Sequence, residues 1–375
     1  MMLELGRCMK IRVLVWGAGD IGKFIAKALK QYEECDYHVV AFTDRYQDYS
    51  PIFEGYPFCK YDELESVSFD YVVIACNNSN LYEKILNNAI EKLNVTQDNI
   101  LRWIDFLNSI RKKCIQEKYK NCNDEEMIAT LKWLETHELS FQNQYTNTEN
   151  VYYEVYDDVE SGYPYILFQG KRMYLPHEVD YLKKDGKRYV VNAVEDAQYP
   201  GSPHLYINGE HTVNEGDVIV DAGTAEGNFT LAHIEKISKA YLFEPDSKWI
   251  EPLRLTFLPW SDKIVLITKL LGDLDNEEWA TLDSVINEKV DFVKMDIEGS
   301  ETKAVLGGLD LLRRSNAKLS ICAYHRRYDD KQLCFLLEAL GYRTSHTNGK
   351  QFFLYDEDID LSLDFRYGVV YGDKK

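Results

Sequence analysis

The sequence contains no apolar run that approaches the roughly 18 residues needed to span a membrane. Its N-terminal residues, MMLELGRCMK, also lack the apolar core of a secretion signal. The 8 cysteines are scattered and include no C-x-x-C pair. Without a secretion signal, such cysteines are typical of reduced thiols, so we expect a cytoplasmic protein without a membrane span.

Basic residues are scarce relative to acidic ones. The 375 residues include 43 Lys and Arg against 62 Asp and Glu, which gives a formal charge of -19. Nucleic-acid phosphates would repel such a surface unless a local basic patch compensated, and the sequence has no visible patch of this kind. We therefore expect no nucleic-acid partner. A hydrophobic content of 45% is ample for buried cores, and this length predicts two domains.

A Gly-x-Gly-x-x-Gly pattern lies near the N-terminus in the context that nucleotide binding requires. The apolar strand IRVLVW precedes Gly17, Gly19 and Gly22, an amphipathic helix follows, and the next strand ends at Asp44. The glycines would allow a phosphate to approach the helix N-terminus, and Asp44 would bind a ribose. Residues 1–104 are therefore predicted to form a Rossmann-like domain, with further strands at 70–75 and 99–104 and a helix near 79–92.

Two interpretations of this N-terminal pattern stay open. Either it binds NAD or another nucleotide, or the glycines serve only the packing of a helix against a strand. No convincing Ser-Tyr-Lys or Cys-His set follows within this domain. The sequence therefore favours a binding or docking module over a complete oxidoreductase.

The middle of the chain changes character twice. Residues 105–149 have a helical pattern with high charge and are predicted to form a connector, with Asp124 as a helix N-cap. Residues 150–215 are rich in tyrosine and β-formers, and Gln169-Gly170-Lys171 predicts a hairpin turn. The rigid loop at 199–204 either folds over a cofactor or is a solvated connector.

The stretch DVIVDAGTAEGNFTLAHIEKISKAYLFEPD has the strand, glycine turn, helix and strand of a nucleotide-binding half-sheet. Gly223 and Gly227 bracket the turn, and Glu244 ends the second strand, where its carboxylate can accept both hydroxyls of a ribose. The spacing is Asp-x-Gly-x-x-x-Gly, starting at Asp221. We hypothesise that it binds an adenosine bearing an amino acid, S-adenosylmethionine, and not a dinucleotide. The alternative is a turn that binds nothing.

The remaining sequence predicts a second doubly wound sheet. Apolar strands are expected at 263–271, at 291–296 and in KLSICAYH, which ends at His325. Asn348-Gly349 is a strong turn signal and predicts a closing antiparallel hairpin between RTSHT and QFFLYD. Five parallel strands closed by a hairpin is the layout of class I methyltransferases. The predicted fold class is therefore α/β, with two doubly wound, Rossmann-like domains.

Four ionisable residues end different strands of this second sheet: Asp221, Glu244, Asp296 and His325. Ligands of open α/β sheets sit beyond the carboxyl ends of the strands, so we expect the four to converge on one cleft. Methyl transfer to an alcohol needs a base or a metal that helps to remove its proton. Asp296 and His325 are the candidates for the base, since histidine titrates near neutral pH.

The same side chains admit other roles. Asp296, Glu298 and His325 could instead hold Mg²⁺ or Mn²⁺ through oxygen and imidazole ligands, so the need for a divalent metal stays open. In a purely structural interpretation, Asp296 caps the next helix or holds the amine of the cofactor, and His325 is a core histidine.

The segments VDAGTAEGNFTL, YLFEPD, TLDSVI and VKMDIEGSETKAVLGG together resemble the FkbM-type S-adenosylmethionine-dependent methyltransferases. The resemblance covers about 217–345, and it implies O-methylation, often of sugars or polyketide-like products. It implies that S-adenosylmethionine binds at Asp221, Gly223, Gly227 and Glu244, and that Asp296 and Glu298 line the acceptor side. Thr224-Ala225-Glu226 departs from the usual Ala-Asn-Ile and brings a negative charge near the cofactor. The N-terminal domain resembles, more weakly, Rossmann-type modules found beside bacterial polysaccharide enzymes.

The leading hypothesis is an S-adenosylmethionine-dependent O-methyltransferase that acts on a hydroxyl of a glycan or glycan precursor, in which residues 150–375 form the methyltransferase domain with a β-rich lead-in. A second hypothesis is an NAD-dependent nucleotide-sugar oxidoreductase or epimerase that works through residues 1–104. A third is a nucleotide-binding scaffold without catalysis. The expected partner is a small-molecule or glycan acceptor, and homo-oligomer formation stays open.

Overall fold

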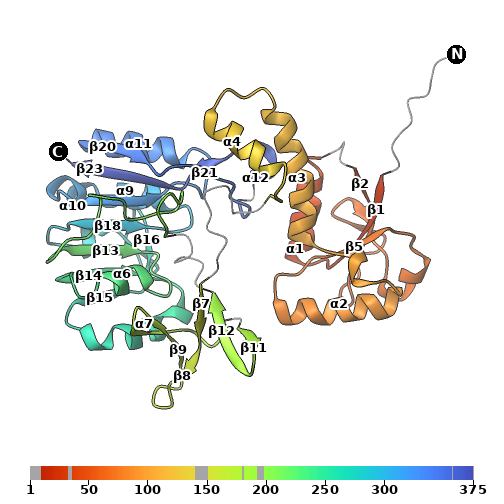
Figure 1. The fold of residues 1–375 in the computed structure, drawn as a ribbon, viewed down its shortest axis with the longest axis horizontal. Coiled ribbons are helices and arrows are strands. Elements are labelled where there is room, and N and C mark those ends of the chain that lie inside the picture. Colours follow the sequence, from red (N-terminus) through yellow and green to blue (C-terminus); the bar gives the residue numbers. More distant parts are fainter. Residues whose placement is uncertain are drawn as a thin grey trace. The chain divides into compact units, whose positions relative to one another are not determined.

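The computed structural model describes residues 10–32, 36–139, 151–179, 181–191, 198–356 and 358–374. The chain divides into two compact units. Unit 1 comprises Met1–Ser140 and Glu357–Leu363, and unit 2 comprises Phe141–Asp356 and Asp364–Lys375. The chain therefore leaves unit 2 once, late in the sequence, to contribute a short segment to unit 1 (Figure 1).

Unit 1 is built on a four-stranded sheet with the order β2-β1-β5-β6, in which every pair is parallel. One of its two interior strands reads IRVLVW, and the last four residues of this strand are buried in the core of the sheet. This confirms the parallel sheet predicted for the N-terminal region. The strands of unit 1 are β1 (Ile11–Trp16), β2 (Tyr37–Thr43), β3 (Ile52–Phe53), β4 (Tyr56–Pro57), β5 (Tyr71–Ile74) and β6 (Ile100–Arg102).

Helices surround this sheet, and two of them lie in the region predicted to be a connector. Asp124 caps α4 as predicted, because its side chain accepts a hydrogen bond from the Met127 amide. The helices of unit 1 are α1 (Asp20–Leu29), η1 (Tyr61–Ser66), α2 (Ser79–Leu93), η2 (Gln97–Asn99), α3 (Trp103–Tyr119), α4 (Glu125–Leu134) and α12 (Ile359–Ser362).

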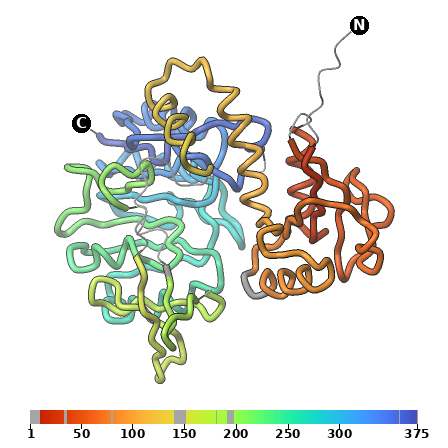
Figure 2. The backbone as a smooth tube through the Cα atoms, turned by 45° about the vertical axis from the view of Figure 1, so that its right-hand side comes forward, coloured from red at the N-terminus to blue at the C-terminus, as the bar shows by residue number. Residues whose placement is uncertain are grey.

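A buried ion pair holds the late segment α12 against α3. The guanidinium of Arg111 is fully buried, and it donates to both carboxylate oxygens of Asp360 at 2.7 and 2.8 Å. The hydroxyl of Tyr32 donates to the same carboxylate. A bidentate pair of this kind needs a dry, fixed geometry, so α12 is an integral part of unit 1 (Figure 1, Figure 2).

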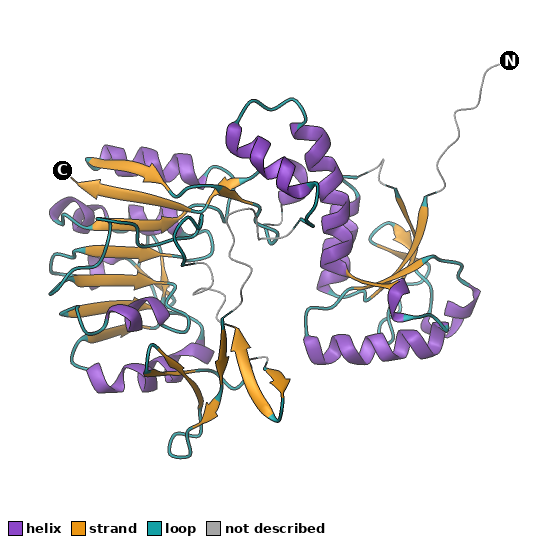
Figure 3. Ribbon diagram, viewed as in Figure 1, coloured by secondary structure: helices purple, strands orange, loops and turns teal. Residues whose placement is uncertain are grey.

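Unit 2 contains a seven-stranded sheet with the order β15-β14-β13-β18-β19-β23-β20. All neighbouring strands are parallel except β23, which runs antiparallel to both of its neighbours. This is the mixed sheet expected of a class I methyltransferase (Figure 3). Its strands are β13 (Val218–Ala222), β14 (Lys239–Phe243), β15 (Ile264–Ile267), β18 (Phe292–Met295), β19 (Lys318–Cys322), β20 (Tyr342–His346) and β23 (Val369–Lys374).

The predicted hairpin at Asn348-Gly349 is wrong. The strand after this turn, β21 (Lys350–Gln351), pairs with β22 (Arg366–Tyr367) in a separate two-stranded sheet. The partner of β20 is β23, which follows only after the chain has passed through unit 1. The local turn signal was correct for a bend, but tertiary pairing decided which strand completed the sheet.

Alternate residues along the strands of unit 2 pack into two separate hydrophobic cores, one on each face of the sheet. Val220 and Tyr241 belong to the core under the late helices, whereas Ile219 and Leu242 belong to the core under α6, α7 and the β-rich lead-in. The helices are α6 (Asn228–His233), α7 (Ser247–Phe257), η3 (Leu258–Trp260), α8 (Leu282–Val285), α9 (Glu301–Leu306), α10 (Leu309–Arg314) and α11 (Asp329–Ala339).

The β-rich lead-in forms two small antiparallel sheets. The predicted hairpin turn is confirmed, since Gln169 and Gly170 connect two paired strands. These short strands are β7 (Tyr152–Glu154), β8 (Tyr156–Asp157), β9 (Pro164–Phe168), β10 (Lys171–Tyr174), β11 (Leu182–Lys184) and β12 (Lys187–Val191), and a further pair is β16 (Leu270–Leu271) with β17 (Trp279–Ala280). Within the described ranges, no helix combines the length and apolar character of a membrane span.

Candidate functional site

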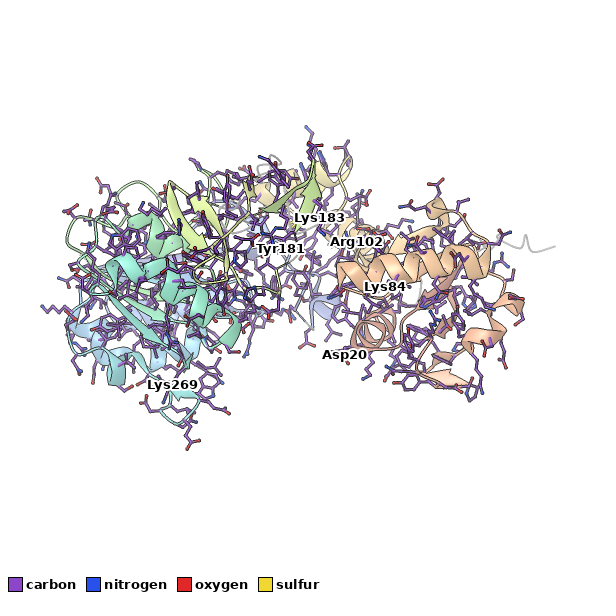
Figure 4. The ribbon with its side chains drawn as sticks, turned by 90° about the horizontal axis from the view of Figure 1, so that it is seen from below. Asp20, Lys84, Arg102, Tyr181, Lys183 and Lys269 are labelled. Carbon is purple, nitrogen blue, oxygen red and sulfur yellow. The ribbon has the colours of Figure 1, made fainter. Side chains whose placement is uncertain are left out.

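A cavity of about 410 Å³ opens at the carboxyl edge of the sheet in unit 2. Of the predicted site residues, Gly223, Glu244, Asp296 and Glu298 line it. Of the four strand-end residues expected to converge on one cleft, Glu244 and Asp296 line this cavity, whereas Asp221 and His325 do not. The other lining residues are Tyr206, Thr224, Ala225, Glu226, Asn228, Phe243, Pro245, Asp246, Lys248, Trp249, Lys269 (labelled in Figure 4), Leu270, Leu271, Lys294, Ile297 and Ser300.

The glycine turn is pressed against the end of β18. Gly223 has φ +72°, and a Cβ atom at this position would lie 1.7 Å from the carbonyl oxygen of Asp296. No side chain fits in that space, so only glycine lets the turn pass this closely. The backbone of the glycine turn and the end of β18 at Asp296 therefore lie side by side in the wall of the cavity.

Glu244 is fixed by the turn that it faces. One carboxylate oxygen accepts from the Ala225 amide at 2.7 Å, and the other accepts from the Asp246 amide at 2.9 Å. Each carboxylate oxygen can accept two hydrogen bonds, so one acceptor position per oxygen remains for a ligand. Burial raises the pKa of Glu244, although these amide hydrogen bonds oppose the shift. This is a rigid acceptor pair of the kind that two neighbouring hydroxyls require.

Asp221 and Gly227 do not line the cavity. Asp221 is fully buried, where it lies 3.1 Å from Lys294 Nζ and accepts from the Thr230 hydroxyl at 2.7 Å. Lys294 in turn donates to the carbonyl oxygen of Gly223 at 2.6 Å. Gly227 has φ +82° and begins α6. Asp221 therefore positions the glycine turn indirectly, through Lys294. We did not single out Lys294 from the sequence.

Asp296 sits at the centre of four aromatic side chains. The hydroxyls of Tyr206 and Tyr324 donate to its two oxygens at 2.8 and 3.3 Å, and Nε2 of both His204 and His325 lies 3.4 Å away. Burial alone would raise the pKa of Asp296, but the neighbouring histidines and a lysine outweigh burial and hold it well below its usual value. Asp296 is therefore an anion at neutral pH, and it does not cap α9.

Carboxylates surround the His325 ring on both sides. Nδ1 lies 3.0 Å from Glu301, while Nε2 lies 3.4 Å from Asp296 and 3.5 Å from Glu298. Burial lowers the pKa of His325, but the contact with Glu301 and the charges of the three carboxylates outweigh this and raise it to about 9. The imidazole is therefore protonated at neutral pH. This corrects its predicted role as the base, because a protonated ring cannot accept a proton.

We expect the free energy of unfolding to decrease between pH 6.5 and about 9 because of His325. A raised pKa adds stability that is complete below the unfolded value and is lost as the pH rises through the folded value. A shift of this size corresponds to roughly 3 kcal/mol. Denaturant unfolding across this pH range would measure the decrease. The variant His325→Gln should no longer show it. The control variant His177→Gln, at an exposed histidine, should show it as the wild type does. An unchanged pH dependence in His325→Gln would contradict this assignment.

The described residues include two groups of three that could hold a metal ion. They are His204, Asp296 and Cys322, and Asp296, Glu301 and His325. In the second group an ion would replace the proton of His325, because imidazole must be neutral to bind a metal. Glu298, which was predicted as a ligand, faces the same Nε2 atom but its side chain is largely exposed.

The predicted nucleotide residues of unit 1 also meet at a cavity, which measures about 560 Å³. Gly17, Gly19 and Asp44 line it, together with Lys84 of α2, which is labelled in Figure 4. Gly22 instead serves packing, since a Cβ atom there would lie 2.3 Å from the carbonyl oxygen of Gly17. Gly22 therefore has a packing role, and nucleotide binding at the Gly17 and Gly19 cavity stays a prediction.

Asp44 and Glu244 are held in the same way. One oxygen of Asp44 accepts from the Ala18 amide at 3.0 Å, as Glu244 does from its own turn. The other oxygen of Asp44 accepts from two amides, those of Tyr46 and Gln47. Asp44 therefore keeps one acceptor position for a ligand, where Glu244 keeps two.

Comparison with known families matches two parts of the chain. Residues 9–101 match the family described as C2185-like, N-terminal, and residues 268–344 match the family described as Methyltransferase FkbM domain. A search of curated proteins found no match.

Several solved structures are similar to the chain. Methyltransferase FkbM from Methylobacillus flagellatus KT is 16% identical, with 98% of this chain and 90% of that chain covered and a TM-score of 0.42. SMU.1697c from Streptococcus mutans, solved in complex with SAH, is 13% identical over 44% of this chain and 91% of that chain, with a TM-score of 0.30. Fibrillarin from Aeropyrum pernix, solved with bound S-adenosyl-L-methionine, is 15% identical over 60% of this chain and all of that chain, with a TM-score of 0.30.

Proposed function

We propose that this chain, whose C-terminal unit carries a domain of the FkbM family of S-adenosylmethionine-dependent methyltransferases, methylates a hydroxyl of a glycan or glycan precursor. The observation that carries the proposal is the single cavity shared by the Gly223 turn, the Glu244 carboxylate and Asp296. The Gly223 turn and the two carboxylate oxygens of Glu244 can bind an adenosine. The buried carboxylate of Asp296 can accept a hydrogen bond from the hydroxyl that is to be methylated.

The charges around the cavity suit a cationic cofactor. Five acidic side chains and three lysines line it, and one of these lysines, Lys294, is already paired with Asp221. A sulfonium ion is attracted by such an excess of carboxylates. Bound S-adenosylmethionine would supply an activated methyl group, and Glu244 would hold both hydroxyls of its ribose.

Asp296 is the group best placed to handle the acceptor proton. Its carboxylate accepts a hydrogen bond from the acceptor hydroxyl and thereby aligns the oxygen with the methyl group. Asp296 would take the proton of that hydroxyl as the oxygen accepts the methyl group. The protonated His325 and the two tyrosine hydroxyls keep Asp296 in place throughout.

For unit 1 we propose a nucleotide-binding role, supported by the cavity at Gly19 and Asp44 and by the likeness of Asp44 to Glu244. Because Asp44 keeps a single acceptor position, a ligand held through one hydroxyl fits it better than a ribose held through two. An NAD-dependent reaction in this unit remains the alternative function.

Calorimetric titration of the full chain, separately with S-adenosylhomocysteine and with NAD, tests the proposal. We expect micromolar binding of S-adenosylhomocysteine at one site per chain. Binding of NAD without S-adenosylhomocysteine would overturn the methyltransferase proposal and move the chemistry to unit 1. Binding of both would support two functional units in one chain.

A further inference from the structure

A second cavity in unit 2, of about 560 Å³, adjoins the first. Tyr206 and Asn228 line both cavities, so the two cavities share part of their walls. The second cavity is further lined by Phe168, Gln169, Gln198, Pro200, Gly201, Ser202, Leu205, Ile207, Asn208, Gly209, Phe229, Ala232, His233, Thr347, Asn348 and Tyr371.

The lining of this second cavity is polar but uncharged. Its 18 residues include no Asp, Glu, Lys or Arg, although 28% of the chain is charged. Burial lowers the pKa of its histidine, His233, to about 4, so that ring is neutral at pH 7 as well. Five side-chain amides, four hydroxyls and two phenylalanine rings make up most of the rest. The contrast with the acidic first cavity indicates a different kind of ligand.

The wall formed by residues 198–209 is fixed before any ligand binds. The Gln198 amide spans the loop, donating to the carbonyl oxygen of His204 at 2.7 Å and accepting from the Tyr206 amide at 2.9 Å. The Tyr371 hydroxyl of β23 donates to the carbonyl oxygen of Leu205 at 2.7 Å. A preformed cavity lowers the entropic cost of binding.

Three amides of the second cavity remain available to a ligand. The side chains of Gln169, Asn208 and Asn348 form no hydrogen bond with any described residue. They come from three separate segments, and each offers both donors and an acceptor. The rings of Phe168 and Phe229 supply the apolar part of the wall. Amides beside aromatic rings match a ring that carries hydroxyls at its edge and C–H groups on its faces.

We propose that this second cavity holds the methyl acceptor and that the part of the acceptor inside it is a neutral sugar ring. The inference rests on the proposed methyltransferase function and narrows its substrate class. A phosphate, carboxylate or ammonium group in this cavity would lose part of its hydration without gaining an opposite charge, which disfavours its binding. The acceptor hydroxyl reaches the first cavity past Tyr206, whose own hydroxyl is bonded to Asp296.

Ligand-observed NMR with the full chain saturated with S-adenosylhomocysteine tests this inference. The probes are methyl glycosides of neutral hexoses, compared with a uronic acid and a hexose 1-phosphate at equal millimolar concentration. We expect at least one neutral glycoside to bind and the charged probes not to bind. Equal or tighter binding of the charged probes, or no binding of any neutral glycoside, overturns the inference.

Variants that add one charge to the wall locate the bound ring. Gln169→Glu and Asn348→Asp should each weaken glycoside binding by about tenfold or more while S-adenosylhomocysteine binds as in the wild type. Gln332→Glu makes the same change on an exposed face of α11 and should have no effect. If Gln169→Glu behaves like Gln332→Glu, the sugar does not occupy this cavity. Failure of S-adenosylhomocysteine to bind the wild type would instead defeat the proposed function itself.

Discussion

Glu244→Ala should reduce the affinity for S-adenosylhomocysteine by roughly 100-fold or more. The wild-type carboxylate is held by two backbone amides and keeps one acceptor position on each oxygen for the ribose. Hydrogen bonds to a charged group contribute about 1.5–3 kcal/mol each, so losing two removes at least about 3 kcal/mol. That energy corresponds to a factor of about 100 or more in Kd. Calorimetry with S-adenosylhomocysteine measures it directly.

Two further variants separate this effect from a general loss of charge or structure. Glu251→Ala removes an equivalent negative charge from α7, where the side chain is about half exposed, and should bind S-adenosylhomocysteine normally. Glu244→Gln keeps the shape and one acceptor, so its affinity should lie between those of the wild type and Glu244→Ala. Wild-type affinity in Glu244→Ala would remove the ribose from this position.

The residues that the sequence could identify lie where a strand meets a turn. Gly223, Glu244 and Asp296 each follow a short apolar strand, and such strands are recognisable from local pattern alone. Parallel strands bring their carboxyl ends to one edge, so chain order was enough to place these three residues at one cavity. The same local reasoning identified the sheet of unit 1.

The residues that sequence reasoning missed owe their position to distant contacts. Tyr206 bonds to Asp296 across 90 positions of the chain, and His204 reaches the same carboxylate. Both belong to a loop without regular structure, and no periodicity marks such a loop. The proline-rich stretch 199–204, expected either to fold over a cofactor or to be a solvated connector, was the one available signal, and it ends at His204. Lys294 was hidden for a different reason, since it lies within a strand that otherwise reads as apolar.

The charge state of His325 also depends on residues far apart in the chain. Glu301 faces one ring nitrogen, while Asp296 and Glu298 face the other. The ordinary pKa of histidine suggested a base, but three carboxylates stabilise the proton instead. Asp296 shows the reverse effect, because the same charges that protonate His325 keep Asp296 ionised. The roles within the pair therefore follow from the packed cluster and not from either residue type.

Asp296→Asn should lower kcat for methyl transfer by roughly 100- to 10,000-fold while leaving the affinity for S-adenosylhomocysteine within about threefold of the wild type. The amide keeps the shape of the carboxylate but cannot take a proton. His325→Gln should lower kcat less, because it leaves the proton-accepting carboxylate in place and removes only the charge that orients it.

A second readout does not depend on the acceptor. Loss of the Asp296 charge removes one of the groups that stabilise protonated His325, so NMR titration should find the pKa of His325 below its wild-type value of about 9. Asp310→Asn, on the exposed side of α10, should change neither kcat nor that pKa. If Asp296→Asn transfers methyl groups at the wild-type rate, the proton leaves by another route, and Asp296 serves only to hold Tyr206, Tyr324 and the histidines around the cavity.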